Sequence, residues 1–306
     1  DIEVFNQEME KQKNRSRKAT KVVAGEWETL FEDDIEEFVG YNRLECEVKI
    51  SKYRKVTTQD KDLYHLVFNL TPFYPEGGGQ IGDIGQISNY SENIQIIDTK
   101  KENNLIIHIS EELPKNISND FTAKVDSEHR NSSSRNHSAT HLLHHVLREE
   151  LGNHVEQKGS LVSPDHLRFD FTHNKPLTNE QLEQLTEQIN TIIMENHKIH
   201  LGHESYDEAI SRGATALFGE KYGDVVRTVQ IGDDHNTYSI ELCGGTHVQQ
   251  TGDLGLFLVT SESSISSNTR RIEAITGKTA FTYANNSLNI LGNISDYRLI
   301  AGTSLF

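Results

Sequence analysis

Two histidines, four positions apart, are the residues of this chain with the clearest potential for metal chemistry. His137 and His141 stand in the stretch NHSATHLLHH, and on an α-helix they project from the same side, one turn apart. Both imidazoles could then reach one point, with His144 on the same stripe of the helix. Spacing alone leaves a second explanation open, in which these are ordinary surface or core histidines that bind nothing.

A cysteine and a further histidine, far along the chain, supply the other half of a possible site. The stretch LCGGTH places three residues between Cys243 and His247, and Gly244 and Gly245 suit a tight turn that lets both side chains converge. Three imidazoles and one thiolate form a borderline-soft donor set that fits zinc in tetrahedral geometry. The sequence therefore predicts a zinc site that joins two distant segments.

Two familiar catalytic motifs do not fit. A zinc-protease helix of the HExxH type needs glutamate after its first histidine, and this chain has Ser138 there. The glycine-rich segment TPFYPEGGGQIGDIG is not a phosphate-binding P-loop, because no Lys-Ser/Thr follows its glycines. Two explanations of this segment stay open: a compact turn, or a close approach of the backbone to a ligand at Gly77, Gly78 and Gly79.

The elements that must position these residues begin with a β-rich region between residues 40 and 125. Short apolar runs there are separated by polar turns, as expected of a small barrel or sandwich. The runs are LECEVKIS, DLYHLVFNL, NIQIIDTK and NLIIHIS. The glycine-rich segment lies between the second and the third of them.

Helices and strands alternate in the part of the chain that carries the histidines. We predict a helix over residues 133–151 with Gly152 as its cap, and a second helix that opens at Thr178 with a capping box and runs to about Asn196. The predicted strands are HVEQKGSLV, HLRFDFTH, VVRTVQIG, YSIEL, LGLFLVTSES and TRRIEAITG, with a short helix in SYDEAISR. The leucine and the phenylalanines of HLRFDFTH would share one face. The expected fold class is α+β: a small, Gly-rich, β-barrel-like subdomain followed by an α/β domain with a mainly antiparallel sheet and the zinc site.

The composition limits the partners of the chain. Its 306 residues carry a net charge of −16, which argues against nonspecific nucleic-acid binding by the whole surface. Its two cysteines argue against a disulfide scaffold, and no run of about 18 apolar residues could span a membrane. We therefore expect a cytoplasmic protein with no membrane partner. The chain starts at Asp1 rather than Met, so we also expect it to be a piece of a longer protein.

Any contact with nucleic acid must then be local. The candidates are Lys158, Arg168, Lys221, Arg270, Arg271 and the basic stretch 11–21 of a helix predicted over residues 1–30. Each has an alternative explanation that needs no nucleic acid. A basic helix face is commonly just solvated, and paired arginines in a strand are often ion-pair partners within the sheet.

Several of these stretches together resemble the editing region of alanyl-tRNA synthetases. The resemblance is carried by HSATHLLHHVLREELGNHVEQKGSLV, LRFDF, ALFGEKYGD, ELCGGTHVQQTGDLGLF and RRIEAITG. The segment TPFYPEGGGQIGDIG resembles the glycine-rich segment that precedes this region, and the helix FNQEMEKQKNRSRKA resembles the connector that follows the aminoacylation half. The resemblance covers about residues 1–280, and its motifs are specific in combination.

The resemblance implies an activity, which is hydrolysis of the ester in seryl- or glycyl-tRNA(Ala). It implies that His137, His141, Cys243 and His247 bind zinc, and that Thr140, Gln157 and Ser160 form the catalytic pocket. Spacing alone leaves another explanation open for the pocket residues, in which Thr140 only bonds back to its own helix and Gln157 and Ser160 face solvent. Contacts with the acceptor end of tRNA(Ala) are expected from Gly77, Gly78, Gly79, Gln80, Lys158 and Arg168. Zinc could take part in the chemistry or only hold groups in place, and both roles stay open.

The resemblance also implies a division into domains. Residues 1–30 would be a helical connector, 31–125 the β-rich subdomain, 126–279 the zinc-dependent editing domain, and 280–306 the start of a C-terminal helical segment. The parent protein would be an ATP-dependent alanine–tRNA ligase that oligomerises through a C-terminal part absent here. Two alternatives remain: a freestanding trans-editing deacylase, and a noncatalytic, zinc-stapled RNA-binding module.

Overall fold

A computed structural model describes residues 23–32, 37–59, 61–216, 222–233 and 237–302 of the chain. They form two compact units. The first comprises the described residues up to Glu76 together with Gly82–Ser127, and the second comprises Gly77–Ile81 together with the described residues from Glu128 onward. Lys221 and the basic stretch 11–21 lie outside the described residues.

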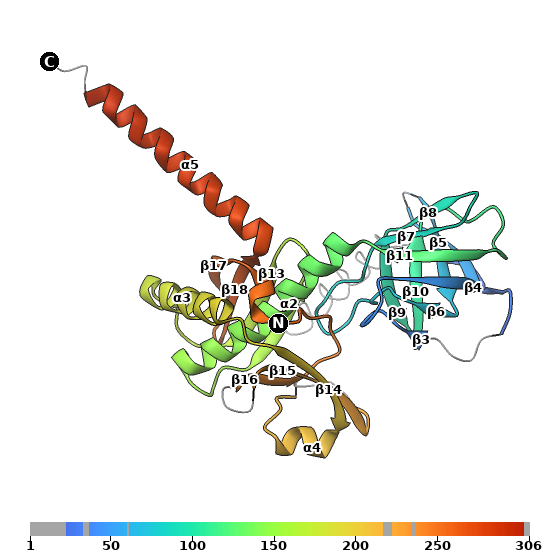
Figure 1. The fold of residues 1–306 in the computed structure, drawn as a ribbon, viewed down its shortest axis with the longest axis horizontal. Coiled ribbons are helices and arrows are strands. Elements are labelled where there is room, and N and C mark those ends of the chain that lie inside the picture. The colour runs from blue at the N-terminus through green and yellow to red at the C-terminus, as the bar shows by residue number, and fades with distance from the viewer. Residues whose placement is uncertain (1–22, 33–36, 60, 217–221, 234–236, 303–306) are drawn as a thin grey trace, which may run out of the picture. The chain divides into compact units, whose positions relative to one another are not determined.

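The first unit is built on a nine-stranded sheet (Figure 1). Its main order is β8-β7-β11-β4-β5-β10-β9, with β1 and β2 also paired to β4, and every pairing in it is antiparallel. The strands are β1 (Val23–Ala24), β2 (Glu28–Thr29), β4 (Glu45–Thr57), β5 (Asp62–Phe68), β7 (Gly85–Ser88), β8 (Asn93–Ile96), β9 (Asp98–Glu102), β10 (Leu105–Ser110) and β11 (Asp120–Val125). A separate parallel pair joins β3 (Glu37–Phe38) to β6 (Leu70–Thr71). The β-rich character predicted for this region is confirmed.

The predicted helix over residues 1–30 is wrong for residues 23–30. There β1 and β2 pair with β4 instead, and the Gly25 N–H donates to the carbonyl of Lys55 at 2.8 Å. Trp27 lies beneath Arg54, whose guanidinium carbon is 4.4 Å from the ring centroid. Gly25 and the β-branched Val23 disfavour a helix, and pairing with a strand far along the chain decides the outcome.

The second unit contains two further antiparallel sheets with helices around them. The first has the order β12-β13-β18-β17 and the second β14-β15-β16. The strands are β12 (Gln157–Val162), β13 (Leu167–Thr172), β14 (Ile199–Ser205), β15 (Val225–Gly232), β16 (Thr237–Leu242), β17 (Phe257–Ser266) and β18 (Thr269–Thr276). The helices are α2 (Ser127–Leu151), α3 (Asn179–Glu195), α4 (Tyr206–Ser211), the 3-10 turn η1 (Thr251–Leu254) and α5 (Gly277–Gly302). The α+β class with antiparallel sheets is confirmed.

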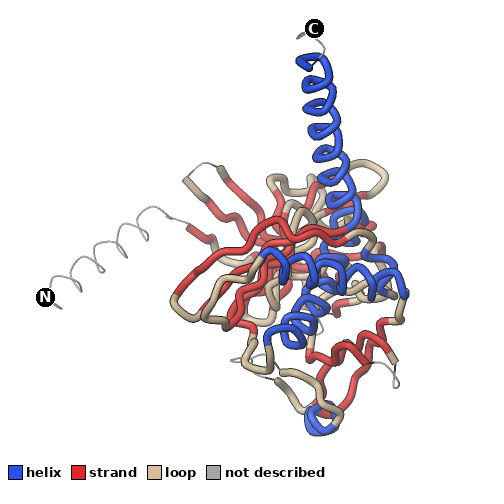
Figure 2. Tube along the Cα trace, turned by 90° about the vertical axis from the view of Figure 1, so that its left-hand side faces the viewer, coloured by secondary structure: helices blue, strands red, loops and turns tan. Residues whose placement is uncertain are grey.

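Local signals fix the ends of the helices in this unit. At the start of α3, Thr178 Oγ1 accepts from the Gln181 N–H at 3.2 Å, and Gln181 Oε1 accepts from the Thr178 N–H at 3.0 Å. The predicted capping box is therefore confirmed. Helix α2 starts at Ser127 rather than at residue 133, and Gly152 follows its last residue with a φ of 107°. Figure 2 shows α5 as a long helix that leads to the C-terminal end. No described helix has the length and apolarity needed to cross a membrane.

One hydrophobic core joins α2, α3 and the four-stranded sheet. It includes Leu142 of α2 and Ile189 of α3, together with residues of β13. Leu167, Phe169 and Phe171 are all fully buried, so the shared face predicted for HLRFDFTH is confirmed. This core fixes α2, and therefore its histidines, against the sheet.

Replacing Phe169 with alanine should lower the free energy of unfolding of the second unit by about 3–5 kcal/mol, because a fully buried ring leaves a cavity. The control is Phe281→Ala on α5, where the ring is 62% exposed and the expected change is within about 0.5 kcal/mol. Denaturant unfolding of the two variants measures both values. Equal losses would contradict the placement of Phe169 in the core.

Candidate metal centre

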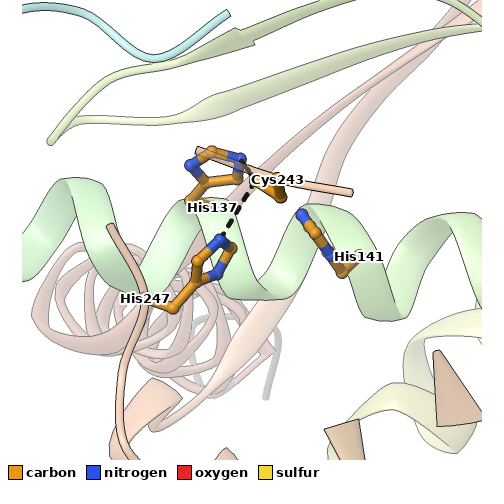
Figure 3. A group of neighbouring side chains, drawn as sticks. All are labelled: His137, His141, Cys243 and His247. Atoms are coloured by element: carbon orange, nitrogen blue, oxygen red, sulfur yellow. Dashed lines mark hydrogen bonds between the residues drawn. The ribbon is translucent and has the colours of Figure 1, made fainter. Parts of the chain in front are cut away.

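Four side chains from two distant segments converge in the second unit. The ligand atoms of His137, His141, Cys243 and His247 all lie within 4.8 Å of one another (Figure 3). The Cys243 sulfur is 3.4 Å from Nε2 of His137 and 3.3 Å from Nε2 of His247. In Figure 3 a ring nitrogen of His141 also turns toward the sulfur. The two pairs singled out from the sequence therefore meet at one point.

The backbone around Cys243 is held by one arginine. The cysteine follows directly after β16, and its N–H donates to the carbonyl of Arg227 in β15 at 3.0 Å. The Arg227 guanidinium donates in return to the carbonyls of Cys243 at 2.7 Å and Gly245 at 2.8 Å. These bonds fold the loop back on itself, so that Cys243 and His247 face α2.

Two of the imidazoles are oriented by neutral polar groups. Nδ1 of His137 lies 2.8 Å from Oε1 of Gln80, and Nδ1 of His247 lies 3.0 Å from Oγ of Ser138. With the Nδ1 proton in these bonds, each Nε2 is left with a free lone pair that points at the sulfur of Cys243. This is the arrangement in which metal-bound histidines are generally found.

The third imidazole is oriented by a carboxylate. Nδ1 of His141 lies 3.3 Å from Oε2 of Glu241, and the other carboxylate oxygen lies 3.2 Å from Nδ1 of His144. His144, which shares the helix stripe of the first two histidines, therefore contacts the carboxylate and is not a member of the four-residue cluster.

Burial keeps the imidazoles of the cluster neutral. It lowers the pKa of His137 to about 3, and it lowers the pKa of His141 and of His247 below the usual value for histidine. Neutral imidazole is the form that binds metal. Zinc bonded to nitrogen and sulfur in a tetrahedron sets neighbouring donor atoms about 3.3–3.6 Å apart. The sulfur–nitrogen distances of 3.4 and 3.3 Å match this spacing, so the residues fit a zinc ion.

The glycine-rich segment supports the cluster from behind. Gln80 is fully buried; its Oε1 accepts from the Thr246 N–H at 2.9 Å as well as contacting His137. Gly79, with a φ of 83°, accepts from the Val162 N–H at 2.7 Å and thereby joins the segment to β12. The side chain of Gln80, which we had expected at the tRNA terminus, is thus turned inward to a histidine.

Two of the expected pocket residues, Thr140 and Ser160, lie on or against segments that carry or contact the cluster. Thr140 is buried one position before His141, and its hydroxyl donates to the carbonyl of Asn136 at 2.8 Å. Ser160 lies next to Gly79, where an added Cβ would come 2.9 Å from the serine carbonyl oxygen. Gln157 is half-buried at the start of β12. Gly79 therefore combines the two explanations of this segment: its positive φ is that of a tight turn, and its backbone lies close to another group. That group is Ser160 of strand β12.

The expected cationic residues are largely engaged with carboxylates. Arg271 makes two bonds to Asp170, at 2.6 and 2.8 Å, and Arg270 makes two to Glu262, at 2.5 and 2.6 Å. This favours the ion-pair explanation for the arginine pair. Lys158 pairs with Glu156 at 3.0 Å, and Arg168 lies 3.9 Å from Asp170.

Sequence reasoning missed four residues that hold the side chains or the backbone of the cluster in place. They are Ser138, Arg227 and Glu241, together with Gln80 in the role described above. Ser138 had entered only as the residue that rules out a protease helix. The signal available for Glu241 was its place two residues before Cys243.

Two family models match the chain. One, described as "tRNA synthetases class II (A)", matches residues 1–129. The other, described as "Threonyl and Alanyl tRNA synthetase second additional domain", matches residues 226–273, which include Cys243 and His247.

Curated relatives match almost the whole chain. A protein named "Alanine--tRNA ligase" from Christiangramia forsetii is 50% identical over 95% of this chain and 33% of its own length. Proteins of the same name from Flavobacterium psychrophilum and Parabacteroides distasonis are 47% and 48% identical, over 95% and 94% of this chain and 34% and 33% of their own lengths. The chain thus spans about a third of the length of these relatives. Together with the convergent cluster and the two family models, these matches make the chain a member of the alanyl-tRNA synthetase family.

Proposed function

We propose that this chain hydrolyses the ester bond of seryl- or glycyl-tRNA(Ala) at a site beside the four-residue cluster. The observation that carries the proposal is the convergence of His137, His141, Cys243 and His247. The family model at residues 226–273 and the ligase relatives support the substrate class. Such an activity would correct errors of amino-acid selection. A pocket that binds alanine can reject serine or glycine by only about 1–3 kcal/mol, because the side chains differ so little.

We assign zinc as the metal, held by the three imidazoles and the thiolate. When bound, zinc would polarise a nearby water or ester group, or would fix the position of the terminal ribose. Four protein donors fill a tetrahedral shell, and catalytic zinc usually keeps one position open. The donor count therefore favours a positioning role.

The chain's own residues then supply orientation and polar contacts. Gln80, Ser138 and Glu241 hold the three rings. The hydroxyl proton of Thr140 is committed to the helix backbone, so its oxygen can still accept a hydrogen bond from water or from a ribose hydroxyl. Gln157 and Ser160, on the neighbouring strand, would orient the attacking water. The substrate contact is the acceptor end of tRNA(Ala), with backbone at Gly77 and Gly78 and side chains such as Lys158 and Arg168 beside it.

For the whole protein we propose an ATP-dependent alanine–tRNA ligase that oligomerises through a part outside this chain. Residues 1–30 would link its aminoacylation half to the β-rich subdomain, 126–279 would form the editing domain, and 280–306 would begin a helical segment. We also propose that residues 31–125 form a barrel-like subdomain. Strands β8 and β9 are the two ends of the strand order, and in the chain only Ile97 separates them. The N–H of Ile97 donates to the carbonyl of Ile109 in β10.

The test is a deacylation assay with the purified, zinc-loaded chain. We expect it to release serine from Ser-tRNA(Ala) and glycine from Gly-tRNA(Ala) at least about tenfold faster than alanine from Ala-tRNA(Ala). Chain treated with a chelator, and uncatalysed hydrolysis in buffer, are the controls. Binding of tRNA with no acceleration of any ester would instead favour the noncatalytic RNA-binding module.

A further inference from the structure

A buried carboxylate stands behind the metal cluster. Glu241 lies near the end of β16, two residues before Cys243, and is only 6% exposed. One of its oxygens faces Nδ1 of His141 at 3.3 Å. The other faces Nδ1 of His144 at 3.2 Å and accepts from the hydroxyl of Ser239, also at 3.2 Å. Both oxygens are therefore engaged, and one of them faces a ligand of the cluster.

Contacts on both sides of this carboxylate counteract the effect of its burial. Burial raises the pKa of Glu241, but the contacts with His141, His144 and Ser239 outweigh that effect and hold the pKa below its usual value. His141 itself is neutral, because burial lowers its pKa. Oε2 of Glu241 lies 3.3 Å from Nδ1 of this neutral ring, as a close electrostatic contact without hydrogen-bond geometry.

A buried negative charge next to neutral rings is costly unless a positive charge lies nearby. A divalent ion bound by one thiolate and three neutral imidazoles retains one net positive charge. Of the three groups that face Nδ1 of these rings, Gln80 and Ser138 are neutral and Glu241 is a carboxylate. The guanidinium of Arg227 is a protein cation close to the same rings. The carboxylate is placed where it would offset the remaining charge of the ion through the ring of His141.

We propose that Glu241 is a positioning residue of the metal centre, which fixes the ring and tautomer of His141 and balances the charge of the bound ion. His144 and Ser239 hold the carboxylate in this place. The inference rests on the proposed binding of zinc, and it adds a residue outside the four ligands. Substitution of a group that contacts a metal-binding histidine in this way typically lowers metal affinity by about 10–100-fold.

The experiment measures zinc affinity of the purified chain by competition with a chromophoric chelator, together with the absorption spectrum of the cobalt-substituted chain. Glu241→Gln keeps the shape of the side chain and removes the charge. We expect its zinc affinity to fall by about 10–100-fold and its cobalt bands to shift, because the ring of His141 is less firmly held. Glu241→Asp restores the charge at shorter reach and should recover part of the affinity.

The matched control is Glu262→Gln, which removes another buried carboxylate charge, in the ion pair with Arg270. It should lower thermal stability without changing zinc affinity or the cobalt bands. If the unmodified chain binds no zinc, the proposed metal centre itself fails. If the unmodified chain binds zinc and Glu241→Gln binds it within about twofold, with unchanged cobalt bands, the role assigned to Glu241 is overturned.

Discussion

Cys243→Ala is expected to lose its zinc and to lower the rate of Ser-tRNA(Ala) deacylation by more than about 100-fold. The substitution removes the only sulfur donor of the cluster and leaves three neutral imidazoles, those of His137 and His141 buried and that of His247 half-buried, facing an empty centre. Zinc binding at structural sites contributes on the order of 10–16 kcal/mol, and here it would join α2 to the loop after β16. Loss of one ligand should therefore also lower the unfolding temperature of the second unit. Elemental analysis, the deacylation assay and thermal unfolding measure the three effects.

The chain offers its own control for this substitution. Cys46 is the second of the two cysteines of the chain; it lies half-buried in β4 of the first unit, opposite Ala123. Cys46→Ala should keep one equivalent of zinc and full deacylase activity. Full activity of Cys243→Ala with no zinc bound would show that ester hydrolysis does not depend on this cluster.

Local spacing was enough to single out the two residue pairs of the cluster and most of the elements of the second unit. The interval between His137 and His141 places both on one side of a helix, whatever the rest of the fold does. The alternation that buries Phe169 and the capping box at Thr178 are local in the same sense, because each depends on neighbours within a few residues. The donor chemistry of Cys243 then supplied the reason to pair two distant segments.

Long-range contacts are what the sequence could not supply. Gln80, Ser138 and Glu241 come from three separate segments, and only the fold shows that each faces one imidazole. Within residues 23–30, the two short strands β1 and β2 form because they pair with β4, and no local pattern in this stretch predicts that partner. The carboxylates that pair with Arg271 and Arg270 also could not be predicted from residue spacing, because they lie on other strands.

Gly245→Ala is expected to weaken zinc binding by about 100-fold or more, because the loop has no room for a side chain here. A Cβ built on Gly245 would lie 1.9 Å from Cε1 and 2.2 Å from Nδ1 of His137. The loop cannot easily retreat, since Arg227 holds the Gly245 carbonyl at 2.8 Å. The ring of His137 must therefore turn away, which would break its contact with Gln80 and move Nε2 off the line to the sulfur.

The control for this steric argument is Gly223→Ala in the same unit. The nearest atom to a Cβ there is 3.9 Å away, so zinc affinity should be unchanged. Chelator competition and cobalt spectra of both variants separate a displaced ligand from a general loss of stability, because only displacement alters the cobalt bands. Zinc binding by Gly245→Ala with the affinity and spectrum of the unmodified chain would mean that the loop can move without moving His137. The close packing of the loop against the ring would then not be what sets the position of His137, and the hydrogen bond from its Nδ1–H to Oε1 of Gln80 would have to do so alone.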